Sequence, residues 1–156
     1  MLRPRRLPSC PIPFALALSL AAVSACQDDD EGVGDAGSQC GEADDCYPDV
    51  EDGDLVSGGM AGAATRICLD RTPDGYCTHT CQSDADCCAA DGECDNDFPQ
   101  VCAPFESTGM MMCFLSCEDT DGIEDGEFCE RYAGRGMGCR STGGGANNRK
   151  VCFPNG

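Results

Sequence analysis

The chain has very little from which to build an ordinary hydrophobic core. It contains no tryptophan, and only 6% of its 156 residues are aromatic. Between Cys40 and Cys152, a stretch of 113 residues, there are thirteen Leu, Ile, Val and Phe, or about 12%. A charged chain with less than roughly 20% of these residues is expected to be disordered unless something else holds it together. Hydrophobic burial alone is therefore not expected to fold this chain.

Basic residues and histidine are also scarce. The chain has 10 Lys and Arg against 28 Asp and Glu, and its one histidine is His79. Such an acidic surface repels nucleic acids and anionic lipids, so we expect no nucleic-acid partner. A catalytic nucleophile needs a base, and no nucleophile motif accompanies His79. We therefore expect His79 to be a surface strand residue and the protein not to be an enzyme.

Cysteine is abundant where apolar residues are rare. The same 113 residues hold fourteen cysteines, about 12%, which is typical of a disulfide scaffold in an exported protein. Disulfides then replace the missing core, and we predict a small, irregular, disulfide-rich fold with short β-hairpins and little or no helix in the mature part. The predicted disulfide cysteines are Cys40, Cys46, Cys68, Cys77, Cys81, Cys87, Cys88, Cys94, Cys102, Cys113, Cys117, Cys129, Cys139 and Cys152.

The first 25 residues have the pattern of an export signal. Three arginines precede the ten-residue apolar run Phe14–Val23, which is too short to span a bilayer. The signal ends in Val23-Ser24-Ala25-Cys26, which resembles the lipobox of bacterial lipoproteins. The resemblance implies cleavage before Cys26, a lipid on its sulfur and an acylated amino terminus. Gln27, where Asp would favour retention in the inner membrane, implies the outer membrane of a Gram-negative bacterium.

The parity of the cysteines supports the lipid independently of this resemblance. Cys10 leaves with the signal, the lipid occupies Cys26, and an even fourteen remain for disulfides. The alternative is an ordinary secretory signal that ends at Ala25 and leaves Cys26 unpaired.

The mature part divides into an acidic tether and a cysteine-rich region. Residues 26–39 hold the lipidated cysteine and a flexible segment with almost no apolar side chain, and residues 40–156 form the disulfide-rich region. The cysteine spacings repeat loosely, in three units at 40–77, 81–113 and 117–152. This pattern resembles the tandem cysteine-rich modules of some secreted and lipid-anchored bacterial proteins, a resemblance that implies no particular activity.

The units limit the disulfide pairing. Bonds within units leave about 3 × 15 × 3 = 135 connectivities, and among these we expect bonds from the first to the third and the second to the fourth cysteine, with Cys88 to Cys94 as an extra pair in the second unit. Two C-x3-C pairs would also suit zinc by spacing, but export to an oxidising compartment favours disulfides.

The segment Pro73-Asp74-Gly75 predicts a β-hairpin. If these three residues form the loop, Cys68 faces Thr80 and Cys77 faces Arg71. Cys68 and Cys77 then lie on opposite faces of the hairpin and bond to different partners.

Six carboxylates crowd into fourteen residues of the second unit, and such clusters can hold calcium. The EF-hand pattern is absent, so a solvated acidic face is the alternative, and we expect no other cofactor. The calcium candidates are Asp84, Asp86, Asp91, Glu93, Asp95 and Asp97.

Two further stretches allow alternative interpretations. Met110–Leu115 is the most apolar run of the folded part and predicts a core strand, with an exposed binding surface as the alternative. Arg131–Gly156 carries five basic residues and no acid. We expect it to fold back on the acidic units; docking onto an anionic envelope or another copy is the alternative.

Together these features predict a lipid-anchored protein of the cell envelope or surface. We expect a non-catalytic binding or structural module whose partner is an unidentified protein or envelope component. The alternatives are a calcium-dependent structural protein and a disulfide-framed inhibitor of extracellular hydrolases, for which Arg71 in the hairpin is the candidate contact residue.

Overall fold

The structure, a computed structural model, describes residues 36–51, 53–94, 98–120, 122–143 and 148–155. The predicted signal, the lipidation site Cys26 and most of the predicted tether lie outside these residues. In the described part, four two-stranded antiparallel sheets and one α-helix account for the regular structure, together with three 3-10 turns. This confirms the predicted disulfide-rich fold of short hairpins. No helix among the described residues has the length and apolar character needed to cross a membrane.

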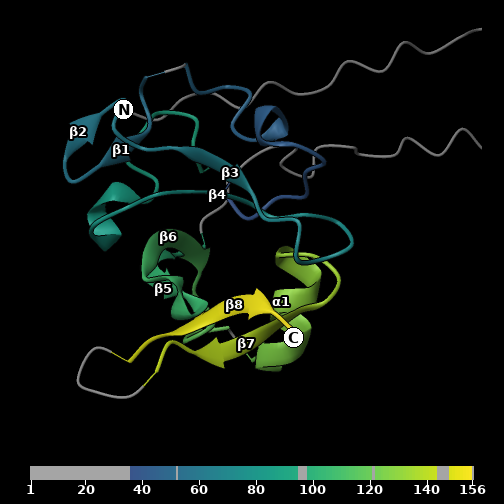
Figure 1. The fold of residues 1–156 in the computed structure, drawn as a ribbon. Coiled ribbons are helices and arrows are strands. Elements are labelled where there is room, and N and C mark those ends of the chain that lie inside the picture. Colours follow the sequence, from purple (N-terminus) through teal and green to yellow (C-terminus); the bar gives the residue numbers. More distant parts are fainter. Residues whose placement is uncertain (1–35, 52, 95–97, 121, 144–147, 156) are drawn as a thin grey trace, which may run out of the picture.

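The strands follow one another as hairpins in chain order (Figure 1). The order is η1 (Ala43–Asp45), β1 (Val56–Ser57), β2 (Met60–Ala61), β3 (Arg66–Cys68), β4 (Cys77–His79), η2 (Asp84–Asp86), β5 (Gln100–Phe105), η3 (Glu106–Thr108), β6 (Met110–Leu115), α1 (Asp125–Tyr132), β7 (Met137–Ser141) and β8 (Lys150–Pro154).

Each predicted unit contains one hairpin in which two cysteines face each other. The facing pairs are Cys68 with Cys77 in β3 and β4, Cys102 with Cys113 in β5 and β6, and Cys139 with Cys152 in β7 and β8. Each facing cysteine is bonded to a cysteine that precedes the hairpin, which ties that preceding segment to the strands. These six bonds are Cys40–Cys68, Cys46–Cys77, Cys81–Cys102, Cys87–Cys113, Cys117–Cys139 and Cys129–Cys152. A seventh bond, Cys88–Cys94, joins two cysteines outside the strands. All seven are the pairs expected from the cysteine spacing, and all lie within a unit.

The register predicted for the first hairpin is wrong by three residues. Cys68 faces Cys77 and not Thr80. The loop is longer than three residues, because Leu69 N–H still donates to the Tyr76 carbonyl at 2.9 Å and the turn closes between Thr72 and Gly75. Because facing residues of an antiparallel pair lie on the same face of the sheet, the prediction that the two cysteines lie on opposite faces is wrong as well. They bond to different partners, as expected, because each is bonded to the segment that precedes the strands.

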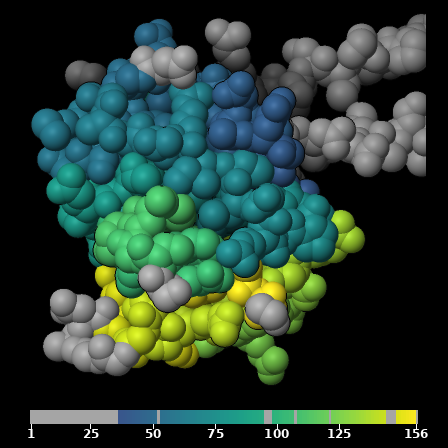
Figure 2. Space-filling model, viewed as in Figure 1, coloured from purple at the N-terminus to yellow at the C-terminus, as the bar shows by residue number. Residues whose placement is uncertain are grey.

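Strand β6 lies at the centre of the molecule and belongs to the core on both faces. Met112, Phe114 and Leu115 are each at most 4% exposed, which confirms the predicted core strand, although Met110 at its start is 46% exposed. An isolated bridge joins Thr80 to Met112 on the side of β4, and another joins Ser116 at the end of β6 to β8. One apolar cluster thus collects side chains from all three units, among them Tyr76, Phe114, Phe128 and Val151. On the face shown in Figure 2, the three units lie directly against one another.

Helix α1 was not expected from the sequence. It buries only Phe128 and Cys129, so it offers no long apolar period, and no side chain caps its first turn. Tertiary contacts hold it: Cys129 is bonded to β8, and Phe98 packs on Phe128 with ring centroids 5.2 Å apart.

The end of the predicted flexible tether belongs to the folded part. Ala36 is 4% exposed, Gly37 N–H donates to the Cys77 carbonyl at 2.9 Å, and Cys77 N–H donates to the Ser38 carbonyl at 2.8 Å. Gly37 has a φ of 88°, which residues with a side chain rarely adopt, and it lies against the ring of Tyr76. Residues 36–38 therefore pack beside β4 as part of the folded region.

Candidate functional site

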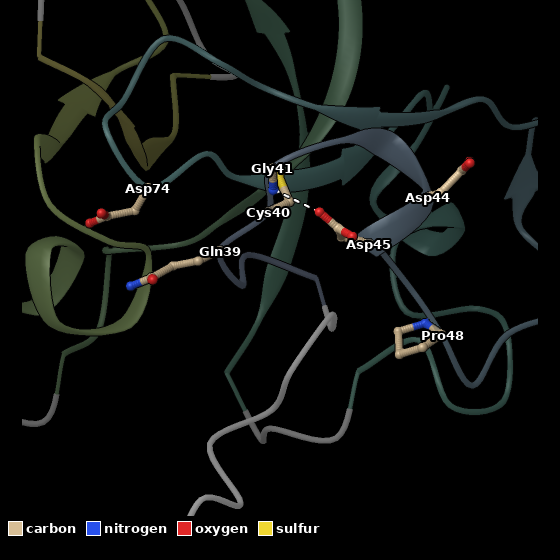
Figure 3. Close-up of a pocket in the computed structure, with 7 residues that line it drawn as sticks. All are labelled: Gln39, Cys40, Gly41, Asp44, Asp45, Pro48 and Asp74. Atoms are coloured by element: carbon tan, nitrogen blue, oxygen red, sulfur yellow. Dashed lines mark hydrogen bonds between the residues drawn. The ribbon is translucent and has the colours of Figure 1, made fainter.

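The hollow shown in Figure 3 is lined partly by carboxylates that already have hydrogen-bond or ion-pair partners. It is formed by Gln39, Cys40, Gly41, Asp44, Asp45, Pro48 and Asp74. Asp45 accepts hydrogen bonds from the N–H groups of Glu42 and Gly41, which lower the pKa of its carboxyl. Asp74 is paired with Arg135, which lowers the pKa of Asp74. The hollow is open and supplies no unpaired buried group that could orient a small molecule.

His79 is not the surface residue that the sequence predicted. Its side chain is fully buried in β4, with Tyr47 edge-on at 5.7 Å. Nδ1 lies 2.9 Å from the Thr80 carbonyl oxygen, and Nε2 lies 2.7 Å from Oε1 of Glu93. Both ring nitrogens therefore have a hydrogen-bond partner, one in the backbone of the next residue and one in the second unit. The cause of the burial is the loop between Cys88 and Cys94, which brings Glu93 against the strand.

Glu93 is held as a buried, ionised carboxylate. Burial acts to raise its pKa, but the hydrogen bond from His79 and those from the N–H groups of Ala90 and Cys88 outweigh it and hold the pKa below its usual range. The pair joins a strand of the first unit to a loop of the second. It is a structural hydrogen-bonded pair, because neither side chain reaches solvent.

Asp86 is a second buried carboxylate that joins the first two units. Its two oxygens accept hydrogen bonds from the N–H groups of Gln82, Ser83, Gly58 and Gly59 at 2.8–3.0 Å. Burial acts to raise its pKa, but these four donors together lower it to about 2. Asp86 thus fixes the β1–β2 turn of the first unit against η2 of the second.

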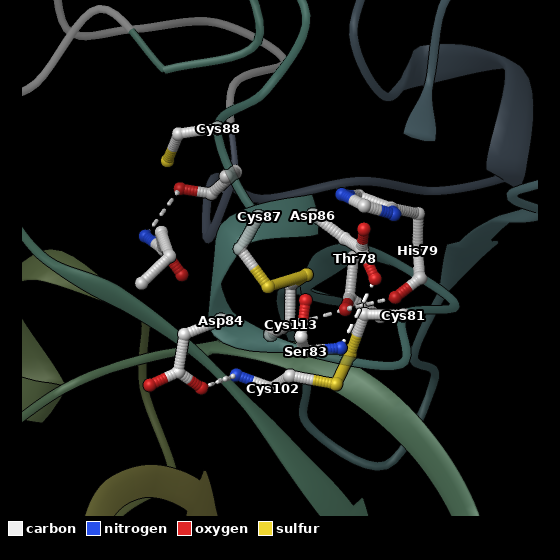
Figure 4. The surroundings of a disulfide bond; sticks show 12 residues. Thr78, His79, Cys81, Ser83, Asp84, Asp86, Cys87, Cys88, Cys102 and Cys113 are labelled. Carbon is white, nitrogen blue, oxygen red and sulfur yellow. Dashed lines mark hydrogen bonds between the residues drawn. A yellow bond between two sulfur atoms is a disulfide. The ribbon is translucent and has the colours of Figure 1, made fainter. Parts of the chain in front are cut away.

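The remaining calcium candidates do not assemble around a common point. Asp84 accepts a hydrogen bond from Cys102 N–H at 2.9 Å, as Figure 4 shows, and pairs with Arg149. Asp91 is exposed, while Asp95 and Asp97 lie outside the described residues. Within the described ranges, no three of these carboxylates have oxygens within 4.8 Å of one another. The carboxylates thus serve chiefly as acceptors for protein donors, and calcium binding stays a prediction that the geometry does not favour.

The groups with metal-ligand spacing in the described part are instead built on cysteines. Three of them combine cysteines of neighbouring disulfides, and the fourth contains Cys88, Glu93 and Cys94. All of these cysteines are in disulfides, so their sulfurs are not thiolate ligands in this state.

The basic carboxyl-terminal segment folds back on the acidic units, as expected. Arg135 pairs with Asp74 of the first unit, with Nε 2.9 Å from Oδ2. Arg149 pairs with Asp84 of the second unit and also with Glu118. These pairs lie at the surface, so they orient the third unit more than they stabilise it.

Arg71 stands on a loop whose other residues are fixed. Its side chain is 60% exposed and lies 3.8 Å from Glu106. Next to it, the hydroxyl of buried Thr72 donates to the Gly75 carbonyl at 3.2 Å, and Cys40 N–H donates to the Asp74 carbonyl at 3.0 Å. The loop is therefore rigid, but little beyond Asp70, Arg71 and Pro73 is exposed.

Sequence reasoning missed the His79–Glu93 pair and the role of Asp86. In each of the first two units an aspartate directly precedes the second cysteine, Asp45 in the first and Asp86 in the second. This repeated position was a usable signal for a capping carboxylate. Nothing in the sequence connected His79 to Glu93. Searches among protein-family models, curated proteins and solved structures found no match to this chain.

Proposed function

We propose that the protein is a lipid-anchored, non-catalytic module of a bacterial cell envelope, which binds a protein or envelope partner or has a structural role there. The observation that carries the proposal is the way its three hairpin units interlock. They share one apolar cluster, and buried polar contacts join the first unit to the second. Such a body presents a rigid surface, which favours binding or support over chemistry.

The anchor is the second part of the proposal. The resemblance of Val23-Ser24-Ala25-Cys26 to a lipobox and the Gln27 that follows support lipidation and the outer membrane. The pairing supports it as well: all fourteen cysteines from Cys40 onward are in disulfides, so none of them is left to pair with Cys26.

The charge of the module indicates the chemistry of its partner. Removal of the three arginines of the signal leaves 7 basic residues against 28 acidic ones, a net charge of about −21. Arg135, Arg149 and Lys150 are already paired with acids of the same chain. A partner is therefore expected to present basic side chains, and binding should weaken as salt rises.

Capture experiments test this function. The oxidised protein without lipid, begun at Gln27 so that residues 36–39 keep their packing, would be immobilised and exposed to envelope extract at low and high salt. We expect a partner that is retained at low salt, released at high salt, and not retained by reduced protein. Equal retention by oxidised and reduced protein would contradict a role for the rigid surface.

Rigidity of the Arg71 loop favours one second candidate, an inhibitor of an extracellular hydrolase that cleaves after basic residues. Arg71 is exposed while its neighbours are held by hydrogen bonds. Inhibition of a trypsin-like protease by the oxidised protein, lost in Arg71→Ala, would support this candidate. Absence of inhibition across a protease panel would remove it.

A further inference from the structure

The disulfide Cys88–Cys94 differs from the other six in its place in the fold. It closes a segment with a sequence separation of only 6, against 21–31 for the others. The first and third units form their hairpins with two disulfides each and have no counterpart of this bond. The hairpin of the second unit retains its own two bonds, so its frame does not depend on Cys88–Cys94.

Three atoms that can bind a metal meet at this disulfide. The sulfurs of Cys88 and Cys94 and a carboxylate oxygen of Glu93 lie within 4.8 Å of one another. Zinc holds sulfur at about 2.3 Å and oxygen at about 2.0–2.2 Å, so its tetrahedral ligands stand roughly 3.5–4 Å apart. Once the bond between the sulfurs is opened, small side-chain rotations are enough to place all three atoms around one ion.

Glu93 is oriented by three hydrogen bonds, one of which comes from His79, outside the loop that the disulfide closes. Its Oε1 accepts from His79 Nε2 at 2.7 Å and from Cys88 N–H at 2.6 Å, and its Oε2 accepts from Ala90 N–H at 3.0 Å. A carboxylate oxygen has two lone pairs, so Oε2 keeps one for a further contact. Neither cysteine is buried, so both a reductant and a metal ion can approach from solvent.

We propose that reduction of Cys88–Cys94 creates a Zn²⁺ site with the thiolates of Cys88 and Cys94 and the carboxylate of Glu93 as ligands. A dithiol supplies two electrons and two protons, opens the S–S bond and itself becomes a disulfide. Zn²⁺ then displaces one proton from each cysteine thiol, and a water molecule occupies the fourth position. His79 is a positioning residue, which orients Glu93 and does not bind the ion.

The test uses the full chain, purified in detergent, with Co²⁺ as the spectroscopic probe for the zinc site. The protein is treated with increasing dithiothreitol, freed of it without oxygen, alkylated in one portion and titrated with Co²⁺ in another. We expect Cys88 and Cys94 to be alkylated first, and one equivalent of Co²⁺ to give tetrahedral and thiolate charge-transfer absorption that Zn²⁺ abolishes. Earlier opening of another disulfide, or no such absorption, would overturn the proposal.

Two sets of variants separate this site from other thiols and from loss of the fold. The double variant C88A/C94A keeps the six hairpin disulfides and should show no thiolate absorption after the same treatment; an equal signal would assign the metal elsewhere. Glu93→Gln should weaken Co²⁺ binding by at least about tenfold, since it alters one of three protein ligands. If Glu93→Gln does not fold, Cys94→Ser, which keeps Glu93, should lose the absorption of a two-thiolate site; unchanged absorption in either variant would sink the assignment.

Discussion

Two aspartates at the same place in successive units show how one local motif acquires different roles. Asp45 and Asp86 each precede the second cysteine of their unit, and each accepts N–H groups from residues three and four positions earlier. Only Asp86 also accepts hydrogen bonds from another unit, from the N–H groups of Gly58 and Gly59 in the β1–β2 turn. Asp45 is exposed and Asp86 is 2% exposed, so the same capping group is local in one unit and joins two units in the other.

Replacement of Asp86 by Asn should destabilise the protein and change its response to acid. The amide loses the charge and one of the two acceptor oxygens, which should lower the free energy of unfolding by roughly 2–4 kcal/mol at pH 7. Because folding lowers the pKa of Asp86 to about 2, its contribution is complete above the ordinary aspartate pKa and is lost as pH falls through about 2. Denaturant unfolding at pH 2–7 should therefore show wild type and Asp86→Asn converging below about pH 4.

Asp45→Asn is the matched control, because Asp45 has the same capping contacts but no contact with the β1–β2 turn. It should lower the free energy of unfolding much less than Asp86→Asn does. An equal loss of unfolding free energy in Asp45→Asn and Asp86→Asn would contradict the role of Asp86 in joining the two units.

Both the backbone conformation and the lack of space require glycine at position 75, whereas only the backbone conformation favours it at position 109. Both have positive φ, 68° and 71°. A Cβ at Gly75 would stand 2.0 Å from the Cys40 carbonyl oxygen, whereas a Cβ at Gly109 would meet nothing within 4 Å. Gly75→Ala should therefore cost roughly 3 kcal/mol or prevent oxidative folding, and Gly109→Ala about 1 kcal/mol. Thermal unfolding of the two variants checks this, and a similar loss in both would show that Gly75 does not lie against Cys40.

At the scale of elements, the unit of construction is a hairpin with two facing cysteines that are each bonded to a preceding segment. That segment is a 3-10 turn in the first two units and contains helix α1 in the third. The frame therefore tolerates different local structure as long as the two bonds can form. The length of the hairpin strands also differs between units, from three residues in β3 to six in β5.

The seven disulfides should not be equally important. Chain entropy assigns about 2 kcal/mol to the short loop closed by Cys88–Cys94 and about 3.5 kcal/mol to the loop closed by Cys87–Cys113. Because Cys87–Cys113 also fixes the central strand, C87A/C113A should fail to fold or should melt much earlier, while C88A/C94A should fold with a modest fall in Tm. Far-UV circular dichroism and calorimetry would measure the fold and the Tm of the two variants. A lower Tm for C88A/C94A than for C87A/C113A would contradict the greater importance of the hairpin disulfide.

At the scale of the whole molecule, the three units form one body because no unit has a sufficient core of its own. Tyr76 illustrates this: it comes from the first unit, stacks on Phe114 at 5.8 Å, and its hydroxyl accepts a hydrogen bond from Leu115 N–H at 2.8 Å. Burial raises the pKa of Tyr76 well above its usual range. A single unit expressed alone would expose such residues and is not expected to be stable.

Attachment to the membrane should depend on Cys26 and not on the folded body. Mass spectrometry of the mature amino terminus is expected to show an acylated Cys26, and Cys26→Ser should move the protein from the membrane fraction to the soluble one. Oxidised Cys26→Ser protein should keep the seven disulfides of the folded part. An unmodified amino terminus at Cys26 would disprove the anchor.

The disulfide pairing could be predicted from sequence because it depends on short-range constraints. Cysteine spacing divides the chain into units, and a hairpin between the third and fourth cysteines leaves each of them to an earlier one. The core strand at Met112–Leu115 could also be predicted, because a chain this poor in apolar residues must bury the apolar run it has.

Contacts between residues far apart in sequence were decided only by the tertiary structure. The register of the first hairpin follows from a turn that packs on Cys40 and is paired through Asp74 with Arg135, 61 residues away. The burial of His79 follows from Glu93, which a loop of the second unit brings to a strand of the first. Local propensity carries no information about either partner. The sequence by itself determined the units within which the cysteines pair and that hairpins form. The packing of the units determined how the strands align and which polar groups are buried.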